Sequence, residues 1–408
     1  MCKWESKINI NQVAEIRSKT TCYLGVGALQ KVNDICDYLK KTGVQAVLIT
    51  TDEIVYKITG VWEILEPALK QRGMKYALYT GVVPNPTVDN IDAAVAMGKE
   101  VGAGAVIGIG GGSPIDTGKS AAVLLHSDNA KYNARDLYLF KFNAEKAVPI
   151  IAINTTHGTG TEVDRFAVAS IPEMDFKPAL AVDCIYPVFA IDDPAIMTKL
   201  PPAQTRYTAV DALNHITEAA TTLVTNPYVI MNAVETARLV YKYLPKVIEK
   251  PDDLTARYYL LYASMIGGIC FDNGLLHYTH ALEHPLSGVK PDLPHGLGLA
   301  MILPAVIKTI YPACPEILAS IYEPYVPGLK GEAGEAQKCA AGVEQWLFSV
   351  GVTEKLADMG YTEQDVDKLT KLAFETPSLD FLLSMAPVKA SKDIVSGIYR
   401  DSMKPIGK

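Results

Sequence analysis

The sequence predicts an α/β fold in which a mostly parallel sheet makes up the first half of the chain and helices make up the second. Three observations support this prediction. Short apolar runs alternate with amphipathic segments as far as residue 200, helical periodicity dominates after Pro201 and Pro202, and 408 residues are enough for two domains. Alternating strand and helix patterns indicate a parallel sheet with helices on both faces. We therefore expect an α/β domain at residues 1–199 and an all-α domain at residues 200–408.

Four apolar runs in the first half have the length and composition of buried strands, and they are residues 46–50, 75–79, 105–109 and 149–153. Between them, residues 61–72 and 88–101 carry apolar side chains at the i, i+3, i+4 and i+7 positions of a helix. In the second half, residues 228–244 have the same period and follow Asn226 and Pro227, a helix cap and a proline at the first turn. Residues 258–271 are apolar but too short to span a bilayer, so we expect a buried helix there.

Composition restricts the class of protein. The net charge is −7 and there is no run rich in lysine and arginine, so nothing indicates nucleic acid or an anionic membrane as a partner. The seven cysteines are scattered without a Cys-x-x-Cys pair, which indicates reduced thiols. The first residues do not resemble a signal peptide, so we expect a cytoplasmic protein.

The placement of the histidines predicts a metal site. Asp211 and His215 are four residues apart, as are His280 and His284, and this spacing puts two side chains on one face of a helix. His295 follows shortly afterwards. One carboxylate with two or three imidazoles from separate helices is a typical ligand set for iron or zinc. His277 and His126 are expected to be ordinary structural histidines.

Two loops favour a bound dinucleotide. Residues 108–113 form a glycine-rich turn between a strand and a helix, where backbone can approach a pyrophosphate, although a plain tight turn has the same composition. Residues 154–162 form a second loop of small and hydroxylated residues after a strand. Asp52 ends the first strand, where it can either bind an adenosine ribose and repel a 2′-phosphate or simply cap a helix. Ligands of open α/β sheets bind at these carboxyl ends of strands.

Taken together, these residues resemble the iron-containing (group III) alcohol dehydrogenases, the family of lactaldehyde reductase and the bacillal methanol and butanol dehydrogenases. The resemblance runs from about residue 46 to about residue 305 in the family's order. The matching stretches are residues 84–87, 110–119, 154–162, 193–194, 211–215 and 280–296.

The resemblance implies a dinucleotide-binding first domain, a metal-binding and catalytic second domain, and a homodimer. It implies that Asp211, His215, His280 and His295 hold Fe²⁺, with Zn²⁺ as the alternative. His284 would lie near the substrate, and we consider it a proton relay or only a residue that shapes the cleft. The implied NAD contacts are Asp52, Asn85, Gly111, Gly112, Ser113, Asp116, Thr155, Thr156, Thr159 and Lys177, with Asp52 favouring NAD over NADP.

The implied reaction is hydride transfer between a nicotinamide and a small primary alcohol or aldehyde. His157 stands where the family usually has alanine or serine. With Arg165, it raises the alternative of an anionic aldehyde such as sulfoacetaldehyde or a semialdehyde.

Three alternative hypotheses assign the protein to other functional classes. Residues 280–284 match the His-x-x-Glu-His peptidase pattern with Glu283 as the base, although Pro285 is expected to break the helix that such a site needs. A lyase related to dehydroquinate synthase would also use a metal and NAD. A non-catalytic metal-binding protein is the third possibility.

Overall fold

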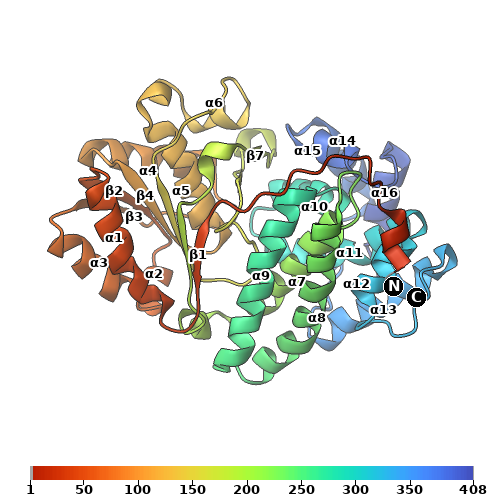
Figure 1. Ribbon diagram of the computed structural model, residues 1–408. Helices are drawn as coiled ribbons and strands as arrows, with labels where there is room; N and C mark the ends of the chain where they lie inside the picture. Colours follow the sequence, from red (N-terminus) through yellow and green to blue (C-terminus); the bar gives the residue numbers. More distant parts are fainter. Residues whose placement is uncertain (1–2, 408) are drawn as a thin grey trace.

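The computed structural model describes residues 3–407, and its first half is built on a six-stranded sheet (Figure 1). The strand order is β1-β8-β5-β4-β2-β3, and every neighbouring pair is parallel. The fold prediction is therefore confirmed. The strands are β1 (Thr21–Leu24), β2 (Ala46–Thr50), β3 (Lys75–Tyr79), β4 (Ala105–Gly110), β5 (Ile150–Asn154) and β8 (Phe189–Asp192).

Helices cover both faces of the sheet because successive strand side chains point to opposite sides. Val47 and Ile49 of β2 pack in one core with helices α1 (Val32–Lys41) and α3 (Val61–Gln71). Leu48, between them, packs in the other core with α4 (Val88–Val101) and α5 (Gly112–Leu125). Two short helices, α2 (Val55–Ile58) and α6 (Ala134–Tyr138), and a small antiparallel ribbon, β6 (Phe166–Val168) and β7 (Ala179–Ala181), complete this half.

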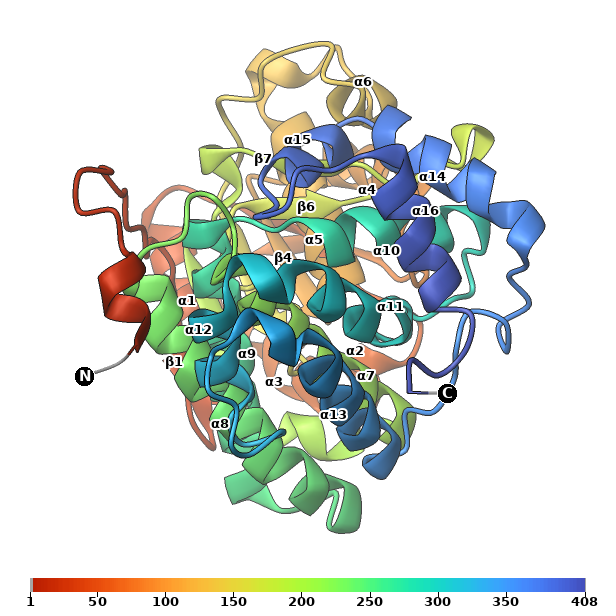
Figure 2. The same ribbon diagram turned by 90° about the vertical axis from the view of Figure 1, so that its right-hand side faces the viewer.

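The second half is helical and begins with α7 (Figure 2). The first helices are long: α7 (Pro202–Ala219), α8 (Pro227–Glu249) and α9 (Leu254–Gly274) pack against one another. Asn226 caps α8 by accepting the Val229 N–H at 3.1 Å, as its sequence predicts. The remaining helices are α10 (Tyr278–Val289), α11 (His295–Ile310), α12 (Pro315–Tyr322), α13 (Ala336–Ser349), α14 (Val366–Glu375), α15 (Leu379–Ser384) and α16 (Lys392–Asp401).

One segment, His295–Ala313, is long and apolar enough to cross a membrane, but 78% of it is buried inside the protein. It contains α11, which packs against α7, α10 and α13 and is therefore a core helix of the second half. The apolar residues 258–271 lie inside α9, as expected.

Two details differ from expectation. Pro285 does not end a helix, because α10 continues through it to Val289. The first described residues lie on the helical half rather than beside the sheet (Figure 1). Trp4 is buried in the helical core, and Lys7 pairs with Glu316 of α12 at 3.1 Å. The chain then crosses over to begin the sheet at β1.

Candidate active site

A cleft of about 340 Å³ lies between the carboxyl ends of the strands and helices α7, α10 and α11. It gathers the predicted site residues from both halves of the chain. Of these, Thr155 alone does not line the cleft, because it is buried behind the loop with its N–H bonded to the Gly110 carbonyl. The predicted residues that line it are Asp52, Asn85, Gly111, Gly112, Ser113, Asp116, Thr156, Thr159, Lys177, Asp211, His215, His280, His284 and His295.

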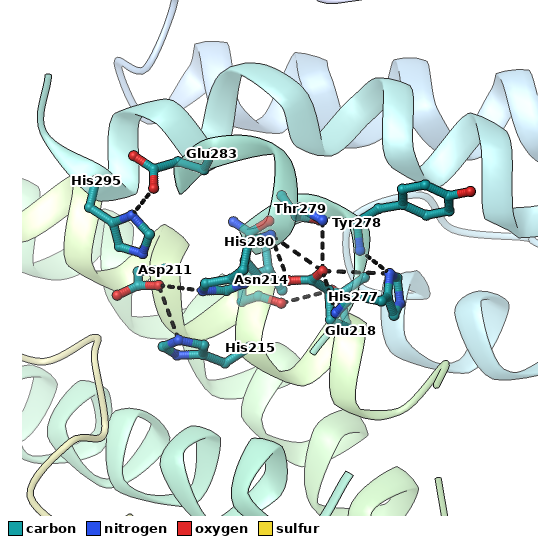
Figure 3. Close-up of polar contacts among 12 residues, drawn as sticks. Asp211, Asn214, His215, Glu218, His277, Tyr278, Thr279, His280, Glu283 and His295 are labelled. Carbon is teal, nitrogen blue, oxygen red and sulfur yellow. Dashed lines mark hydrogen bonds and ion pairs between the residues drawn. The ribbon is translucent and has the colours of Figure 1, made fainter. Parts of the chain in front are cut away.

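The four predicted metal ligands converge from three helices (Figure 3). Asp211 and His215 lie one turn apart on α7, His280 is on α10, and His295 is the first residue of α11. The ligand atoms of Asp211, His280 and His295 lie within 4.8 Å of one another. The Nε2 atoms of His215 and His280 are 3.4 and 3.6 Å from Asp211 Oδ1.

Each of the three imidazoles uses its other nitrogen for a hydrogen bond to an oxygen. His280 Nδ1 donates to Glu218 on α7, His295 Nδ1 donates to Glu283 on α10, and His215 Nδ1 donates to the Gly158 carbonyl at 3.2 Å. Carboxylate and carbonyl oxygens only accept, so the proton sits on Nδ1. The Nε2 lone pairs are left for a cation, which is the usual arrangement around a metal-binding histidine.

Ionisation around the cluster follows from burial and neighbouring charge. Burial lowers the pKa of His215 to about 4, so this imidazole is neutral at pH 7. Burial alone would raise the pKa of Asp211, but the imidazoles, led by His215, outweigh it and hold that pKa at about 2. Burial opposes the charge on His280 as well, yet Glu218 and Asp211 raise its pKa to about 9. A cation bound here would replace that proton.

The residues present fit a divalent metal. Asp211 Oδ1 and His280 Nε2 are buried, and neither has a hydrogen-bond partner among residues 3–407. A buried carboxylate oxygen and a buried ring nitrogen without partners are costly unless something satisfies them. Oxygen from aspartate and nitrogen from histidine are ligands that Fe²⁺ and Zn²⁺ both accept.

The glycine loop fits a dinucleotide because it packs too tightly for larger side chains. A Cβ on Gly111 would lie 2.7 Å from Thr156 Cγ2, and one on Gly112 would lie 3.0 Å from Thr159 Cγ2. Gly111 also caps α5 without any side-chain bond, which leaves the first N–H groups of α5 free to bind an anion. The two loops thus meet beside a helix N-terminus that faces the cleft.

Asp52 caps the start of α2 and also lines the cleft. Its Oδ1 accepts the N–H groups of Ile54 and Val55, each at 2.8 Å, and so caps the start of α2. The same side chain lines the cleft. Oδ1 is therefore used by the backbone, and Oδ2 is left for a ligand in the cleft.

Asn85 and Lys177 line the cleft and also join the two halves of the chain. Lys177 Nζ donates to Asn85 Oδ1 and Ser287 Oγ, both at 2.8 Å, and lies 3.4 Å from Glu283 Oε2. The Asn85 amide donates to the carbonyls of Pro291 and Leu293 at 2.8 and 3.1 Å. Its backbone has a positive φ of 51°, a conformation that asparagine tolerates better than most residues.

His284 lies one helical turn after His280 and is buried at the cleft wall. Its Nδ1 donates to the Lys177 carbonyl at 2.8 Å, so its Nε2 carries a lone pair. Burial lowers the pKa of His284 well below its usual value. The cleft wall nearby is apolar: Phe271 packs on His215 with ring centroids 4.5 Å apart, and Phe166 packs on Phe271 at 5.2 Å.

The structure argues against the anion-binding roles considered for His157 and Arg165. Neither side chain lines the cleft. His157 is fully buried and accepts a hydrogen bond from Arg257 at 2.9 Å. Arg165 pairs instead with Asp183 at 3.0 Å and lies 3.4 Å from a carboxylate oxygen of Asp272.

His277 has the structural role expected of it. It is buried, its Nδ1 accepts the Tyr278 N–H at 2.7 Å, and its Nε2 lies 2.9 Å from Thr221 Oγ1.

One residue that supports the site was missed in the sequence, and another was misinterpreted. Glu218 lies seven residues after Asp211, on the same face of α7, and this spacing was a signal for it. Glu283 was considered only as a peptidase base, but it does not line the cleft, and its Oε2 is engaged by His295 and Lys177.

Comparison with known proteins agrees with this geometry. A model of the iron-containing alcohol dehydrogenases matches residues 19–194, and a model of the C-terminal part of the Fe-containing alcohol dehydrogenase family matches residues 205–403. The long-chain primary alcohol dehydrogenase AdhA of Thermoanaerobacter ethanolicus is 59% identical over 399 residues, covering 98% of this chain and 100% of that protein.

More distant relatives match over most of the chain, in sequence or in structure. The NAD-dependent methanol dehydrogenase of Bacillus methanolicus is 31% identical over 86% of this chain and 91% of its own length. The crystal structure of NADH-dependent butanol dehydrogenase A from Thermotoga maritima has a TM-score of 0.84 and 28% identity, covering 96% of this chain and 99% of that one. The chain belongs to the iron-containing alcohol dehydrogenase family.

Proposed function

We propose that this protein interconverts apolar primary alcohols and their aldehydes, using NAD(H) and Fe²⁺ held by Asp211, His215, His280 and His295. One observation carries the proposal: a single cleft holds the convergent Asp-His donor set, the glycine-rich start of α5 and an apolar wall. In this proposal, residues 1–199 bind the dinucleotide and residues 200–408 bind the metal. A cytoplasmic homodimer is part of the same proposal.

When bound in this cleft, Fe²⁺ would supply Lewis acidity and NAD(H) would supply or accept the hydride. The protein's own residues position and protect the reactants. The open N-terminus of α5 binds the pyrophosphate, and Asp52 accepts from the ribose while repelling a 2′-phosphate. The bond from Nδ1 to the Lys177 carbonyl fixes the His284 ring, and His284 Nε2 would pass on the alcohol proton or, in the alternative, only shape the cleft.

Apolar lining at the cleft favours an apolar substrate chain. Phe166, Val168, Phe271, Leu276 and Leu382 line it from separate elements. Each additional buried CH₂ contributes about 0.8 kcal/mol, which corresponds to about a fourfold gain in kcat/KM until the wall is filled. An anionic aldehyde has no cationic partner in His157 or Arg165, for the reasons given above.

The test is NADH oxidation, followed at 340 nm, by Fe²⁺-loaded protein with a panel of aldehydes. Neutral aldehydes of increasing chain length should be the best substrates, and sulfoacetaldehyde and semialdehydes should be poor ones. Asp211→Ala and His280→Ala should lose both bound metal and turnover, whereas His126→Ala, at a partly exposed histidine outside the cleft, should keep both. Normal turnover by metal-free His280→Ala would refute the proposal. Product formation without net NADH consumption would point to a lyase instead.

A further inference from the structure

We propose that Glu283 is a positioning residue, which holds His295 in the orientation that presents Nε2 to the metal and ties that orientation to the opposite half of the protein. The inference rests on the proposed metal site. In the His-x-x-Glu-His pattern, His280 and His284 already have roles in the proposed dehydrogenase site. The inference gives a role to Glu283 as well.

His295 needs such support more than the other ligands do. His215 and His280 lie within helices and their side chains are 6% and 4% exposed, whereas the His295 side chain is 27% exposed. His295 is also the first residue of α11 and directly follows the connection from α10. Its ring is therefore the least constrained by packing, and the carboxylate of Glu283 supplies the missing constraint at Nδ1 (Figure 3).

The structure makes room for Glu283 in this position. Its side chain is fully buried between α10 and α11. Gly298 lies opposite on α11, and a Cβ there would lie 2.7 Å from Glu283 Cγ and 2.9 Å from its Oε1. Such an approach is possible only because residue 298 is glycine. A buried carboxylate is costly unless it is paired, and this one accepts from His295 and lies 3.4 Å from the Lys177 ammonium.

Lys177 extends the support across the cleft. It belongs to the first half of the chain and also donates to Asn85 Oδ1 at 2.8 Å. Asn85 in turn donates to the carbonyls of Pro291 and Leu293, in the connection that leads to His295. The first half of the chain therefore supports His295 by two routes. Lys177 contacts Glu283, which bonds the His295 ring, and Asn85 bonds the backbone that precedes His295.

A rival role for Glu283 is direct metal binding, because Glu283, His284 and His295 also have ligand atoms within 4.8 Å of one another. The positive charge of Lys177 beside Glu283 Oε2 disfavours a cation at that position. The Nδ1 atom of His295 is also already used by Glu283. Metal binding through Oε2 would break both contacts, which positioning explains. Oε1 has no hydrogen-bond partner among residues 3–407, and it faces Gly298 on α11.

The experiment measures Zn²⁺ affinity by competition with a chromogenic chelator, the number of ions bound, and the visible spectrum of Co²⁺-loaded protein. The variants are Glu283→Ala and Glu283→Gln. The control is Glu344→Gln. Glu344 is a buried glutamate of α13 that pairs with Lys355 at 2.6 Å, and it does not line the cleft. Circular dichroism and thermal unfolding confirm that each variant is folded.

Glu283→Ala should raise the Zn²⁺ dissociation constant about 10- to 100-fold and change the Co²⁺ spectrum. Glu283→Gln keeps an accepting oxygen but loses the charge, so it should raise the constant by about fivefold. Glu344→Gln should stay within about twofold of the parent. If Glu283→Ala does not fold, the Zn²⁺ dissociation constant of Glu283→Gln tests the inference instead.

Two results would overturn the inference: dissociation constants within about twofold of the parent in the folded Glu283 variants, or a parent that binds two ions and a variant that binds one. The first leaves the proposed function intact if the parent still binds metal and oxidises NADH. A parent that binds no metal would remove the proposed function and this inference together.

Discussion

Replacing His157 with glutamine should flatten the dependence of stability on pH without changing substrate selectivity. His157 is fully buried, and its Nε2 accepts from Arg257 at 2.9 Å while its Nδ1 lies 3.4 Å from Thr208 Oγ1. Burial, reinforced by the positive charge of Arg257, lowers the pKa of His157 to about 3 from its ordinary value of 6.5. Glutamine offers Arg257 an accepting oxygen but has no proton to gain.

The direction of the effect follows from proton binding. Between pH 6.5 and 3 the unfolded chain binds a proton at His157 and the folded protein does not, so acidification through this window favours unfolding. The neutral buried imidazole therefore contributes stability that is present near pH 7 and is lost as pH falls. With these two pKa values, the loss between pH 7 and pH 5 is about 2 kcal/mol. Other buried groups contribute equally to parent and variant, so the difference between the two isolates His157.

The assay is urea unfolding of His157→Gln and parent at pH 7 and pH 5. The variant should lose about 2 kcal/mol less than the parent over this interval. In parallel, the ratio of kcat/KM for hexanal to that for a semialdehyde should stay within about twofold of the parent ratio. Equal losses of stability in the two proteins would refute the burial argument. A selectivity change of more than about tenfold would restore a substrate-binding role for His157.

Substitutions at two further positions, Asp52 and Gly296, test the cofactor and metal sites. Asp52→Asn keeps the oxygen that caps α2 but removes the charge, so the kcat/KM ratio for NADPH over NADH should rise by about tenfold. Asp52→Ala should raise the same ratio and also cost about 1 kcal/mol in urea unfolding, because the cap is lost; an unchanged ratio in both would exclude Asp52 from ribose recognition. Gly296→Ala would place a Cβ 2.1 Å from the Tyr207 carbonyl oxygen and displace the first turn of α11. It should weaken Zn²⁺ binding by about tenfold, whereas Gly397→Ala, in α16 with nothing within 4 Å, should leave Zn²⁺ binding unchanged.

Of the four strands that were predicted, β2, β4 and β5 are buried along their whole length, and β3 is only partly buried. β2 and β3 have the predicted bounds, β4 is one residue longer at its end, and β5 is shifted by one residue at both ends. β1 and β8 were not predicted. β1 has four residues that are half-buried or exposed, and it becomes a strand only because it pairs with β8, which is 165 or more residues away in the sequence. A local pattern does not contain that pairing.

Helical spacing predicted that Asp211 lies beside His215 and His280 beside His284, and the choice of His295 over His284 as a ligand came from the family resemblance. The surroundings of these residues depend on how helices pack. Asp211 and His215 share a face of α7 whatever α7 touches. That Glu218 meets His280 depends on how α7 lies against α10, across 62 positions of sequence. For the same reason, sequence alone did not show that His157 and Arg165 turn toward Arg257, Asp183 and Asp272 rather than into the cleft. The sequence can predict that a residue lies in or beside a loop, but not the direction in which its side chain points.

The charges buried around the site explain why it suits a divalent cation. Asp211, Glu218 and Glu283 have pKa values below their usual range, because the neighbouring imidazoles outweigh the effect of burial, so all three are negative at pH 7. Lys177 supplies one buried positive charge. A bound metal replaces the protons of the imidazoles, and an ion of charge +2 then balances the three carboxylates and Lys177, whereas a monovalent ion would leave a net negative charge in a medium that solvates it poorly. The two glutamates that were not recognised as part of the site therefore supply the charge that a single aspartate ligand does not.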